Sequence, residues 1–275
     1  MTRSHFQEMG DRLGVTAWHD LDLIKIFPTA NEVKQWHRAM NSDASDLLSL
    51  EERPEVAQAG IAAPLGYGVV KECVWVDLTE LLRAHRIELN ADGSLSEFMI
   101  EEKDIVTISD GVRVHGRSAK WIIHCEGPFH QLPGLVPVKG EVLTLRIPGL
   151  RLKNIVHRGV FLLPIGDERF KLGSTFVWEN AFSGPTGEGR DHLLAKLKEF
   201  LPHDVEILDH QAGVRPAARD RRPILGKIAP GHAVMNGLGA RGVMVAPWCA
   251  DHLIDHLFEG KPLHPEVDLQ RFVMQ

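Results

Sequence analysis

The sequence predicts a mixed α/β (α+β) fold, in which helix-flanked strands near both ends of the chain surround a mostly antiparallel sheet. Three observations predict this class. Helical spacing and short apolar runs follow one another over residues 6–85 and again over 233–257. Alternating strands, separated by Pro, Gly and Asp, fill residues 141–178. Hydrophobic residues make up 44% of the chain and charged residues 25%, which is typical of a globular protein.

In the first part of the chain, apolar spacing and turn residues predict alternating helices and strands. The expected elements are a helix ending at Leu13, a strand over 21–27, a helix after a capping box at 29–32, a strand over 67–76 and a helix from Asp77 to about His85. In the last of these helices, we expect Leu78, Leu81 and Leu82 to face the core.

The middle of the chain predicts two groups of strands. Three successive strands are expected over 98–108, 112–115 and 119–125, and three alternating strands over 141–147, 156–165 and 170–178. The run at 119–125 has an apolar centre and leads to Gly127, as a central strand of an α/β sheet does beside a ligand crevice. An amphipathic helix carrying Leu193 and Leu197 follows and ends at Pro202.

The stretch from residue 213 to 247 carries the strongest functional signal. An apolar run at 233–235 predicts a strand, which leads through Gly-Leu-Gly-Ala-Arg-Gly at 237–242 into a helix. Glycines let backbone N–H groups approach a ligand closely, and a helix N-terminus favours an anion. Arg215 precedes Pro216, which predicts an extended backbone and a guanidinium suited to holding a carboxylate.

Composition and charge argue against several classes of protein. The net charge is −6, which is not that of a general nucleic-acid binder. No run of about 18 apolar residues occurs, and the start lacks the apolar core of a signal peptide, so no membrane span is expected. The cysteines Cys73, Cys125 and Cys249 show no paired spacing, so we expect a reduced, cytoplasmic setting.

Several readings of the candidate residues stay open. Residues 237–242 match G-x-G-x-x-G literally, so a nicotinamide-dependent enzyme and a plain glycine turn are alternatives. No apolar strand follows over 262–275, which favours a ligand-facing helix end. His252 and His256 are four apart on a helix but lack a third ligand, so no metal site is predicted. Cys125 is expected to be a small buried thiol rather than a nucleophile.

Several motifs in their order along the chain are familiar. Residues 213–226 and 236–247 resemble the C-terminal signature of FAD-dependent oxidoreductases of the D-amino-acid oxidase and glycine oxidase superfamily. Residues 121–127 and 138–145 are similar to that family's second cofactor-side strand and its exit into the substrate domain. Residues 161–175 resemble the family's antiparallel substrate sheet.

The resemblance implies an incomplete FAD-binding Rossmann-like domain interleaved with a mostly antiparallel β-sheet substrate domain. Its cofactor-side segments would be about 77–134 and 211–275, and its substrate-side segments about 15–76 and 135–210. The family opens with a βαβ unit whose glycine-rich turn holds the ADP half of FAD. This chain is expected to lack that N-terminal unit.

The resemblance also implies roles for particular residues. Arg215 matches the arginine that binds the substrate carboxylate. Residues 238–244 match the loop and helix start at the isoalloxazine, and residues 125–127 match a strand end near the pyrophosphate and ribityl chain. The implied cofactor-binding residues are Cys125, Glu126, Gly127, Gly237, Leu238, Gly239, Ala240, Arg241, Gly242, Val243 and Met244. Some members carry another polar substrate contact at the place of Ala240, which leaves the substrate open.

The implied function is that of an FAD-dependent oxidoreductase that oxidises the amine of a small amino acid or related amine by hydride transfer to flavin. No catalytic acid or base is predicted, because the task of Arg215 would be to orient the substrate. We expect the chain alone to bind FAD weakly, since the diphosphate donors belong to the N-terminal unit. The alternative is an inactive, non-enzymatic remnant that binds carboxylates or a partner. Self-association into a homo-oligomer is left open.

Overall fold

The chain forms two structural units that are interleaved in sequence. The computed structural model describes residues 2–273. Unit 1 contains the residues up to Trp18, Val76–Val138 and the residues from Arg215 onward, and unit 2 contains His19–Trp75 and Lys139–Val214. The identification of unit 1 with the cofactor side and of unit 2 with the substrate side stays a prediction.

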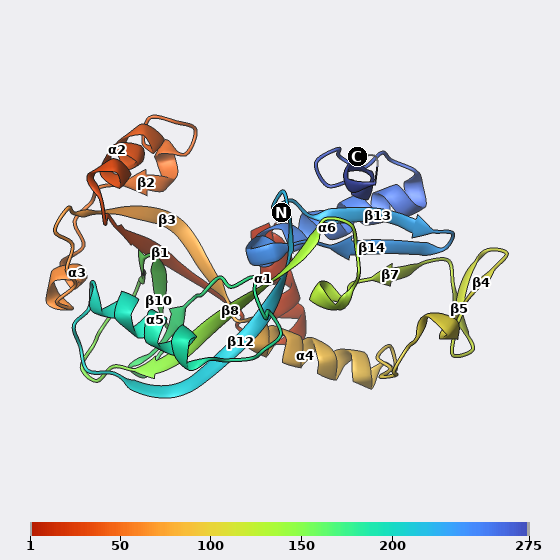
Figure 1. Ribbon diagram of the computed structural model, residues 1–275, viewed down its shortest axis with the longest axis horizontal. Coiled ribbons are helices and arrows are strands. Elements are labelled where there is room, and N and C mark those ends of the chain that lie inside the picture. The colour runs from red at the N-terminus through yellow and green to blue at the C-terminus, as the bar shows by residue number, and fades with distance from the viewer. Residues whose placement is uncertain (1, 274–275) are drawn as a thin grey trace. The chain divides into compact units, whose positions relative to one another are not determined.

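The main sheet has eight strands in the order β12-β8-β11-β10-β9-β1-β3-β2 and belongs mainly to unit 2 (Figure 1). Its strands are β1 (Trp18–Ile26), β2 (Leu48–Ser49), β3 (Tyr67–Val76), β8 (Leu135–Arg146), β9 (Ile155–Arg158), β10 (Val160–Pro164), β11 (Arg169–Gly173) and β12 (Glu206–Ala218). Strands β8, β11, β10 and β9 pair antiparallel in turn, whereas β1 pairs with β9 in parallel. The prediction of a mostly antiparallel sheet in this part of the chain is confirmed.

Two helices of unit 2 begin at a threonine cap, and a short third helix begins with Pro54 at its first position. The helices are α2 (Ala30–Ala39), α3 (Pro54–Gln58) and α5 (Gly187–Lys198). Thr29 accepts a hydrogen bond from the amide of Glu32 at 3.3 Å, and Thr186 accepts one from the amide of Gly189 at 3.1 Å. Leu193 and Leu197 of α5 are buried in the core under the sheet, which confirms the predicted apolar face.

Unit 1 is built on a three-stranded sheet in the order β13-β14-β7 (Figure 1). Its strands are β7 (Ile122–His124), β13 (Ile224–Ala229) and β14 (His232–Asn236). Helix α6 (Gly242–Ile254) follows β14 and continues as a π-helix over Asp255–Glu259, which ends at Gly260 in the left-handed conformation. Its helices α1 (Thr2–Leu13) and α4 (Leu78–Ala91) pack together, and α1 also packs on α6. The strand, glycine turn and helix predicted over 233–257 are confirmed.

A second small sheet of unit 1 corrects the predicted strand bounds. It consists of β4 (Ile105–Ile108), β5 (Gly111–Val114) and β6 (Arg117–Ala119), paired antiparallel in that order. The strand predicted from residue 98 therefore starts at Ile105 instead. Phe98 and Met99 are 58% and 87% exposed and lie outside the strands, although Phe98 stacks on the ring of His115. The run 119–125 is divided between β6 and the three-residue strand β7.

Two further predictions for unit 1 are wrong. Within the described residues, β7 is an edge strand of its sheet rather than a central one, since its pairing is to β14 alone. Helix α4 extends to Ala91, and of its predicted inward leucines only Leu81 is buried. Leu78 is 37% exposed and Leu82 62%, because packing against α1 covers a narrow stripe of the helix. Over residues 2–273, the helices all fall short of the length and apolar character that a bilayer span requires.

Candidate functional site

The candidate site lies where β7 and β14 end. These strands are parallel, with Val234 opposite His124, so their carboxyl ends meet at one edge of the sheet. Asn236 is buried at this edge and joins the two segments that follow. Its Nδ2 donates to the carbonyl of Gly127 at 2.9 Å, and its Oδ1 accepts from the amide of Gly237 at 2.8 Å. The structure thus brings residues 125–127 beside the glycine-rich turn.

The turn after β14 needs glycine at two positions. Gly237 has φ +69° and Gly239 has φ +56°, a region that residues with a Cβ rarely adopt. A Cβ on Gly237 would lie 2.7 Å from Cγ1 of Ile224, so the close packing on β13 also excludes a side chain there. Glycine at these positions lets the chain turn sharply from the strand into α6.

The end of β12 passes beside both segments. Ala217 forms a β-bridge with Leu238, and a Cβ placed on Gly127 would lie 4.0 Å from Cγ of Pro216. Arg215 belongs to this strand, which confirms its predicted extended backbone. Its side chain is half-buried, and burial lowers the pKa of the guanidinium. At neutral pH it still carries the charge that a carboxylate needs.

The start of α6 presents backbone donors near the same turn. Its N-cap residue Arg241 makes no side-chain capping bond within the described chain, and its guanidinium donates instead to the carbonyl of Arg221. Val243 and Met244 in the first turn are exposed. The first amides of a helix without such a cap suit a phosphate or another anionic group. Together, the glycines with φ > 0° and this helix start fit a cofactor with an anionic edge.

Cys125 differs from the expectation of a buried thiol, and Glu126 follows it directly. Cys125 is exposed, because β7 ends one residue before it. Atoms around the sulfur still desolvate it, and this burial, followed by the Glu126 charge, raises the pKa of the thiol. Burial alone would raise the pKa of Glu126, but hydrogen bonds from His124 and His130 outweigh it and lower that pKa. The Cys125 thiol is therefore protonated at neutral pH, which does not favour a nucleophilic role.

Two groups of histidines have different surroundings. His252 Nε2 accepts from the amide of His264 at 2.8 Å, and His256 Nδ1 donates to the carbonyl of Lys261 at 2.7 Å, so both rings bind nearby backbone. His124, Glu126 and His130, in contrast, face one another. Sequence reasoning missed this second group. The spacing His-x-Glu-x-x-x-His directly after an apolar strand was the available signal.

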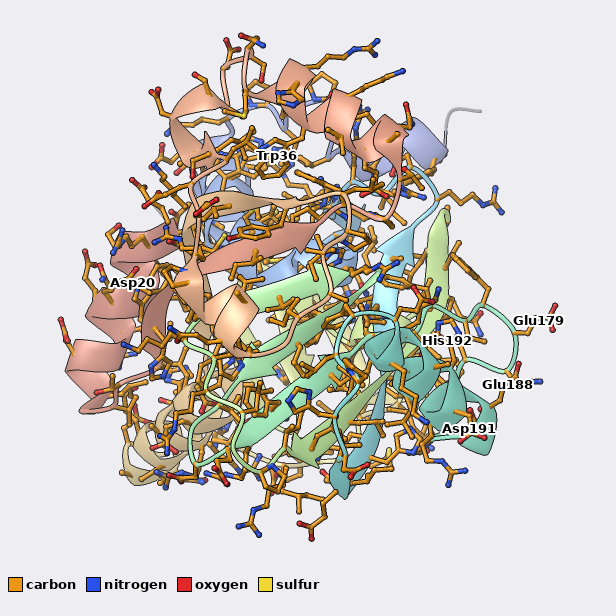
Figure 2. The ribbon with its side chains drawn as sticks, turned by 90° about the vertical axis from the view of Figure 1, so that its left-hand side faces the viewer. Asp20, Trp36, Glu179, Glu188, Asp191 and His192 are labelled. Carbon is orange, nitrogen blue, oxygen red and sulfur yellow. The ribbon has the colours of Figure 1, made fainter. Side chains whose placement is uncertain are left out.

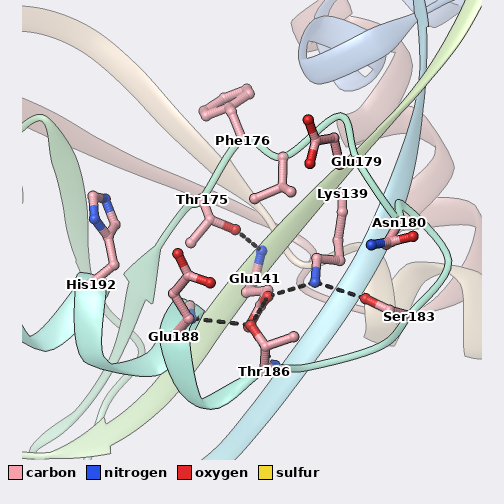
Figure 3. Close-up of a pocket in the computed structure, with 12 residues that line it drawn as sticks. Lys139, Glu141, Thr175, Phe176, Glu179, Asn180, Ser183, Thr186, Glu188 and His192 are labelled. Carbon is pink, nitrogen blue, oxygen red and sulfur yellow. Dashed lines mark hydrogen bonds and ion pairs between the residues drawn. The ribbon is translucent and has the colours of Figure 1, made fainter.

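A cavity of about 420 Å³ lies in unit 2, away from these residues in the sequence (Figure 3). Lys139 and Glu141 of β8 contribute to its wall, with their charged atoms 3.0 Å apart. Figure 2 shows Glu188, Asp191 and His192 on α5, with Glu179 on the loop beside the helix. Sequence reasoning did not identify this cavity, because its wall combines β8, the loop after β11 and the start of α5. We favour the strand-end site as the site of reaction, because the buried charges in the cavity wall, Lys139 and Glu141, form an ion pair with each other.

The Lys139–Glu141 pair is held by a dense set of hydrogen bonds (Figure 3). Lys139 Nζ donates to Oγ of Ser183 at 3.0 Å and to the carbonyl of Gly184 at 3.1 Å. Glu141 accepts from the amide and hydroxyl of Thr186, at 2.9 and 2.8 Å, and faces Nε2 of His210 at 2.8 Å. Burial alone would raise the pKa of Glu141, but the bonds from Thr186 and Lys139 outweigh it and lower the pKa to about 2.

Comparison with known proteins identifies the class. The profile of a family described as "FAD dependent oxidoreductase" (DAO) matches residues 2–256. The chain therefore belongs to the DAO family of FAD-dependent oxidoreductases. This finding confirms the predicted superfamily, and it makes FAD rather than a nicotinamide the cofactor of the family.

Among curated proteins, two kinds of relative share part of their length with this chain. The tRNA 5-methylaminomethyl-2-thiouridine biosynthesis bifunctional protein MnmC of Aeromonas hydrophila is 25% identical over 274 residues, covering 82% of this chain and 41% of that protein. Glycine oxidase of Pseudomonas aeruginosa is 28% identical over 138 residues, covering 48% of this chain and 38% of that protein. The chain spans about two-fifths of the length of these relatives.

Solved structures share the fold at low identity. Iminodiacetate oxidase from Chelativorans sp. BNC1 superposes with a TM-score of 0.76 and 20% identity, covering 98% of this chain and 80% of that chain. Glycine oxidase from Geobacillus kaustophilus gives a TM-score of 0.75 and 22% identity, covering 98% and 79%. The predicted mixed α/β fold class is confirmed. The roles predicted for Arg215 and for residues 125–127 and 237–244 stay predictions.

Proposed function

We propose that this chain is part of an FAD-dependent oxidoreductase that oxidises the C–N bond of a small amine bearing a carboxylate. One observation supports the proposal most. The ends of β7 and β14, joined by Asn236, adjoin the end of β12, so three segments with predicted roles meet in unit 1. Family membership independently supports FAD as the cofactor.

The residues present fit an anionic, planar cofactor. Gly237 and Gly239 leave the turn without side chains, and α6 offers amides to a group that gains negative charge. When bound, FAD supplies the two-electron acceptor for the oxidation. The part of Arg215 is to hold the carboxylate of the substrate, so that the carbon to be oxidised keeps a fixed orientation. Such a site works by positioning and needs no further acid or base.

The substrate class follows from charge and from the names of similar proteins. Solved structures with this fold include an iminodiacetate oxidase and glycine oxidases, whose named substrates are small amines with carboxylates. The MnmC relatives are named for tRNA modification instead. We favour the small molecule, because the net charge of −6 gives no general attraction to a polyanion.

The test is flavin binding followed by reduction. Because the chain alone is expected to bind FAD weakly, we keep it in excess FAD without oxygen, and expect one of glycine, sarcosine, iminodiacetate or L-proline to bleach the flavin absorption band. No bleaching by these amines, but bleaching by an aminomethyl-modified tRNA, would move the proposal to the nucleic-acid substrate. No change in flavin fluorescence or absorption when the chain is added to FAD would favour the alternative, a carboxylate-binding module without cofactor.

A further inference from the structure

A carboxylate and two imidazoles converge just after β7. Oε1 of Glu126 accepts from Nδ1 of His124 at 2.8 Å, and Oε2 of Glu126 accepts from Nδ1 of His130. In each ring, Nδ1 is therefore the nitrogen that faces the Glu126 carboxylate. The potential ligand atoms of the three residues all lie within 4.8 Å of one another.

The local fold explains why these side chains meet. His124 is the last residue of β7, and Glu126 precedes a 3₁₀ turn over Gly127–Phe129. Gly127 has φ +60°, which lets the turn reverse sharply and return His130 beside Glu126. Three potential ligands thus come from one short segment anchored at one end by β14.

The other nitrogen of His124 also has a defined partner. Its Nε2 lies 3.1 Å from Nδ1 of His232, the first residue of β14, and the two rings are stacked with 11° between their planes. A histidine that binds a metal through one nitrogen is commonly oriented by a hydrogen bond from the other. His232 occupies the place of that orienting partner.

We propose that His124, Glu126 and His130 bind one divalent transition-metal ion of the zinc class, with His232 orienting His124. Two imidazole nitrogens and a carboxylate oxygen suit Zn²⁺ and its first-row neighbours, whereas Ca²⁺ and Mg²⁺ prefer oxygen ligands. The His124 and His130 side chains are only 10% and 17% exposed, but that of Glu126 is 48% exposed. The ion can therefore enter from solvent, and three protein ligands leave a fourth position for water or another small ligand.

This inference does not rest on flavin binding, because it concerns side-chain atoms that can be tested without FAD. The experiment uses tag-free protein stripped with a chelator and titrated with Co²⁺, followed by competition with Zn²⁺. We expect one Co²⁺ per chain with the visible bands of a four- or five-coordinate ion, and displacement by Zn²⁺ at micromolar concentration or below. Zn²⁺ should also raise the melting temperature of the stripped protein.

Variants test each proposed ligand separately. Glu126→Gln and His130→Ala should each weaken Zn²⁺ binding at least tenfold and remove or shift the Co²⁺ bands. His232→Phe keeps a stacking ring without the nitrogen, and should weaken binding by about 10-fold through orientation alone. The matched control is His264→Ala, which removes an imidazole outside the proposed site but keeps the backbone amide bonded to His252, and it should leave affinity and bands unchanged. Circular dichroism of each variant checks the fold.

Two results would overturn the proposal. One is the absence of saturable Co²⁺ or Zn²⁺ binding at high micromolar concentration by stripped, folded wild-type protein. The other is stoichiometric binding that is unaffected by Glu126→Gln and His130→Ala but lost in His264→Ala, which would place the ion at the other histidine group.

Discussion

At the scale of the residue, the Lys139–Glu141 pair is the strongest electrostatic feature of unit 2. The two side chains are 4% and 1% exposed, so both charges are almost fully withdrawn from water. Such burial is costly unless each remaining hydrogen-bonding atom has a partner. The bonds to Ser183, Gly184 and Thr186 supply those partners and tie β8 to the start of α5. We infer a structural role for the pair.

Replacing Glu141 by glutamine should destabilise unit 2 strongly. The introduced side-chain amide would turn an N–H₂ donor toward the donors of Lys139 or Thr186 and leave the lysine charge without its counterion. We expect a loss of about 3–5 kcal/mol in the free energy of unfolding, measured by urea denaturation. Glu188→Gln, an exposed change at the same cavity, is the control and should shift that free energy by less than about 0.5 kcal/mol.

The same carboxylate predicts how stability depends on pH. The folded pKa of Glu141 is lowered to about 2, below the ordinary value of 4.5, so its contribution is present above the unfolded pKa. It is lost as pH falls from about 4.5 toward about 2, and a shift of this size corresponds to roughly 3 kcal/mol. Unfolding measured at about pH 5 and about pH 3 should show about 2 kcal/mol of this loss in the wild type, because pH 3 is still above the folded pKa. Glu141→Gln should show a correspondingly smaller slope, and an equal slope would contradict the assignment.

Arg215 gives the residue-scale test of the proposed function. In flavin-loaded protein, Arg215→Met should lower kcat/KM for the best carboxylated amine by about 100-fold, which is the loss of a charge-assisted pair of about 3 kcal/mol. Flavin content should not change, because the predicted cofactor contacts lie elsewhere. Arg219→Met, an exposed change on the same segment, is the control. Equal kinetics for the two variants would remove Arg215 from the site.

At the scale of the element, the glycine turn between β14 and α6 depends on Gly237. Gly237→Ala introduces a methyl group 2.7 Å from Ile224 in a left-handed conformation, so β13 or the turn must shift. We expect a loss of about 2–4 kcal/mol in unfolding free energy. Gly14→Ala is the matched control, because Gly14 also has a positive φ but no atom within 4 Å of the added Cβ. Gly14→Ala should lower the free energy of unfolding by about 1 kcal/mol. Equal losses in the two variants would contradict a packing role for Gly237.

The elements also show which features of the sequence were sufficient to predict a helix, strand or turn. Local patterns predicted β3, α5 and the passage from β14 into α6, because periodicity, a cap or glycines define each one within a few residues. The edge position of β7 depends on pairing with β14, a distant segment of the chain, and local apolarity does not encode it. Likewise, Leu82 lies at helical spacing from Leu78, yet only tertiary packing against α1 decides which leucine is covered. The group around Glu126 was missed because a turn, rather than a regular period, assembles it.

At the scale of the whole molecule, two units have separate cores and shared chain segments. Leu162, Phe170 and Phe200 are buried in the core of unit 2, whereas Leu225, Cys249 and Leu253 are buried in that of unit 1. The sequence predicted this interleaving through the family resemblance more than through composition. Local physics does not specify which distant segments share a core.

Separate cores predict a local response to a core change. Leu253→Ala should lower the free energy of unfolding by about 2–5 kcal/mol, because Leu253 is 1% exposed and truncating its side chain leaves a cavity. Hydrogen exchange should accelerate in β13 and β14 while β10 and β11 keep their protection. Ile254→Ala, a neighbouring change at a side chain 44% exposed, is the control and should cost under about 1 kcal/mol. Uniform acceleration in all four strands would show that the cores unfold as one.

The bond between Asn236 and Gly127 spans 109 positions of the chain. A ribosome adds residues in order, so β7 emerges long before the strand that pairs with it, and the whole segment Lys139–Val214 of unit 2 is made in between. The pairing of β7 with β14 therefore forms late in synthesis. Until then a half-made chain leaves unpaired the edge of β7 that β14 later covers, and this edge is open to incorrect pairing during synthesis.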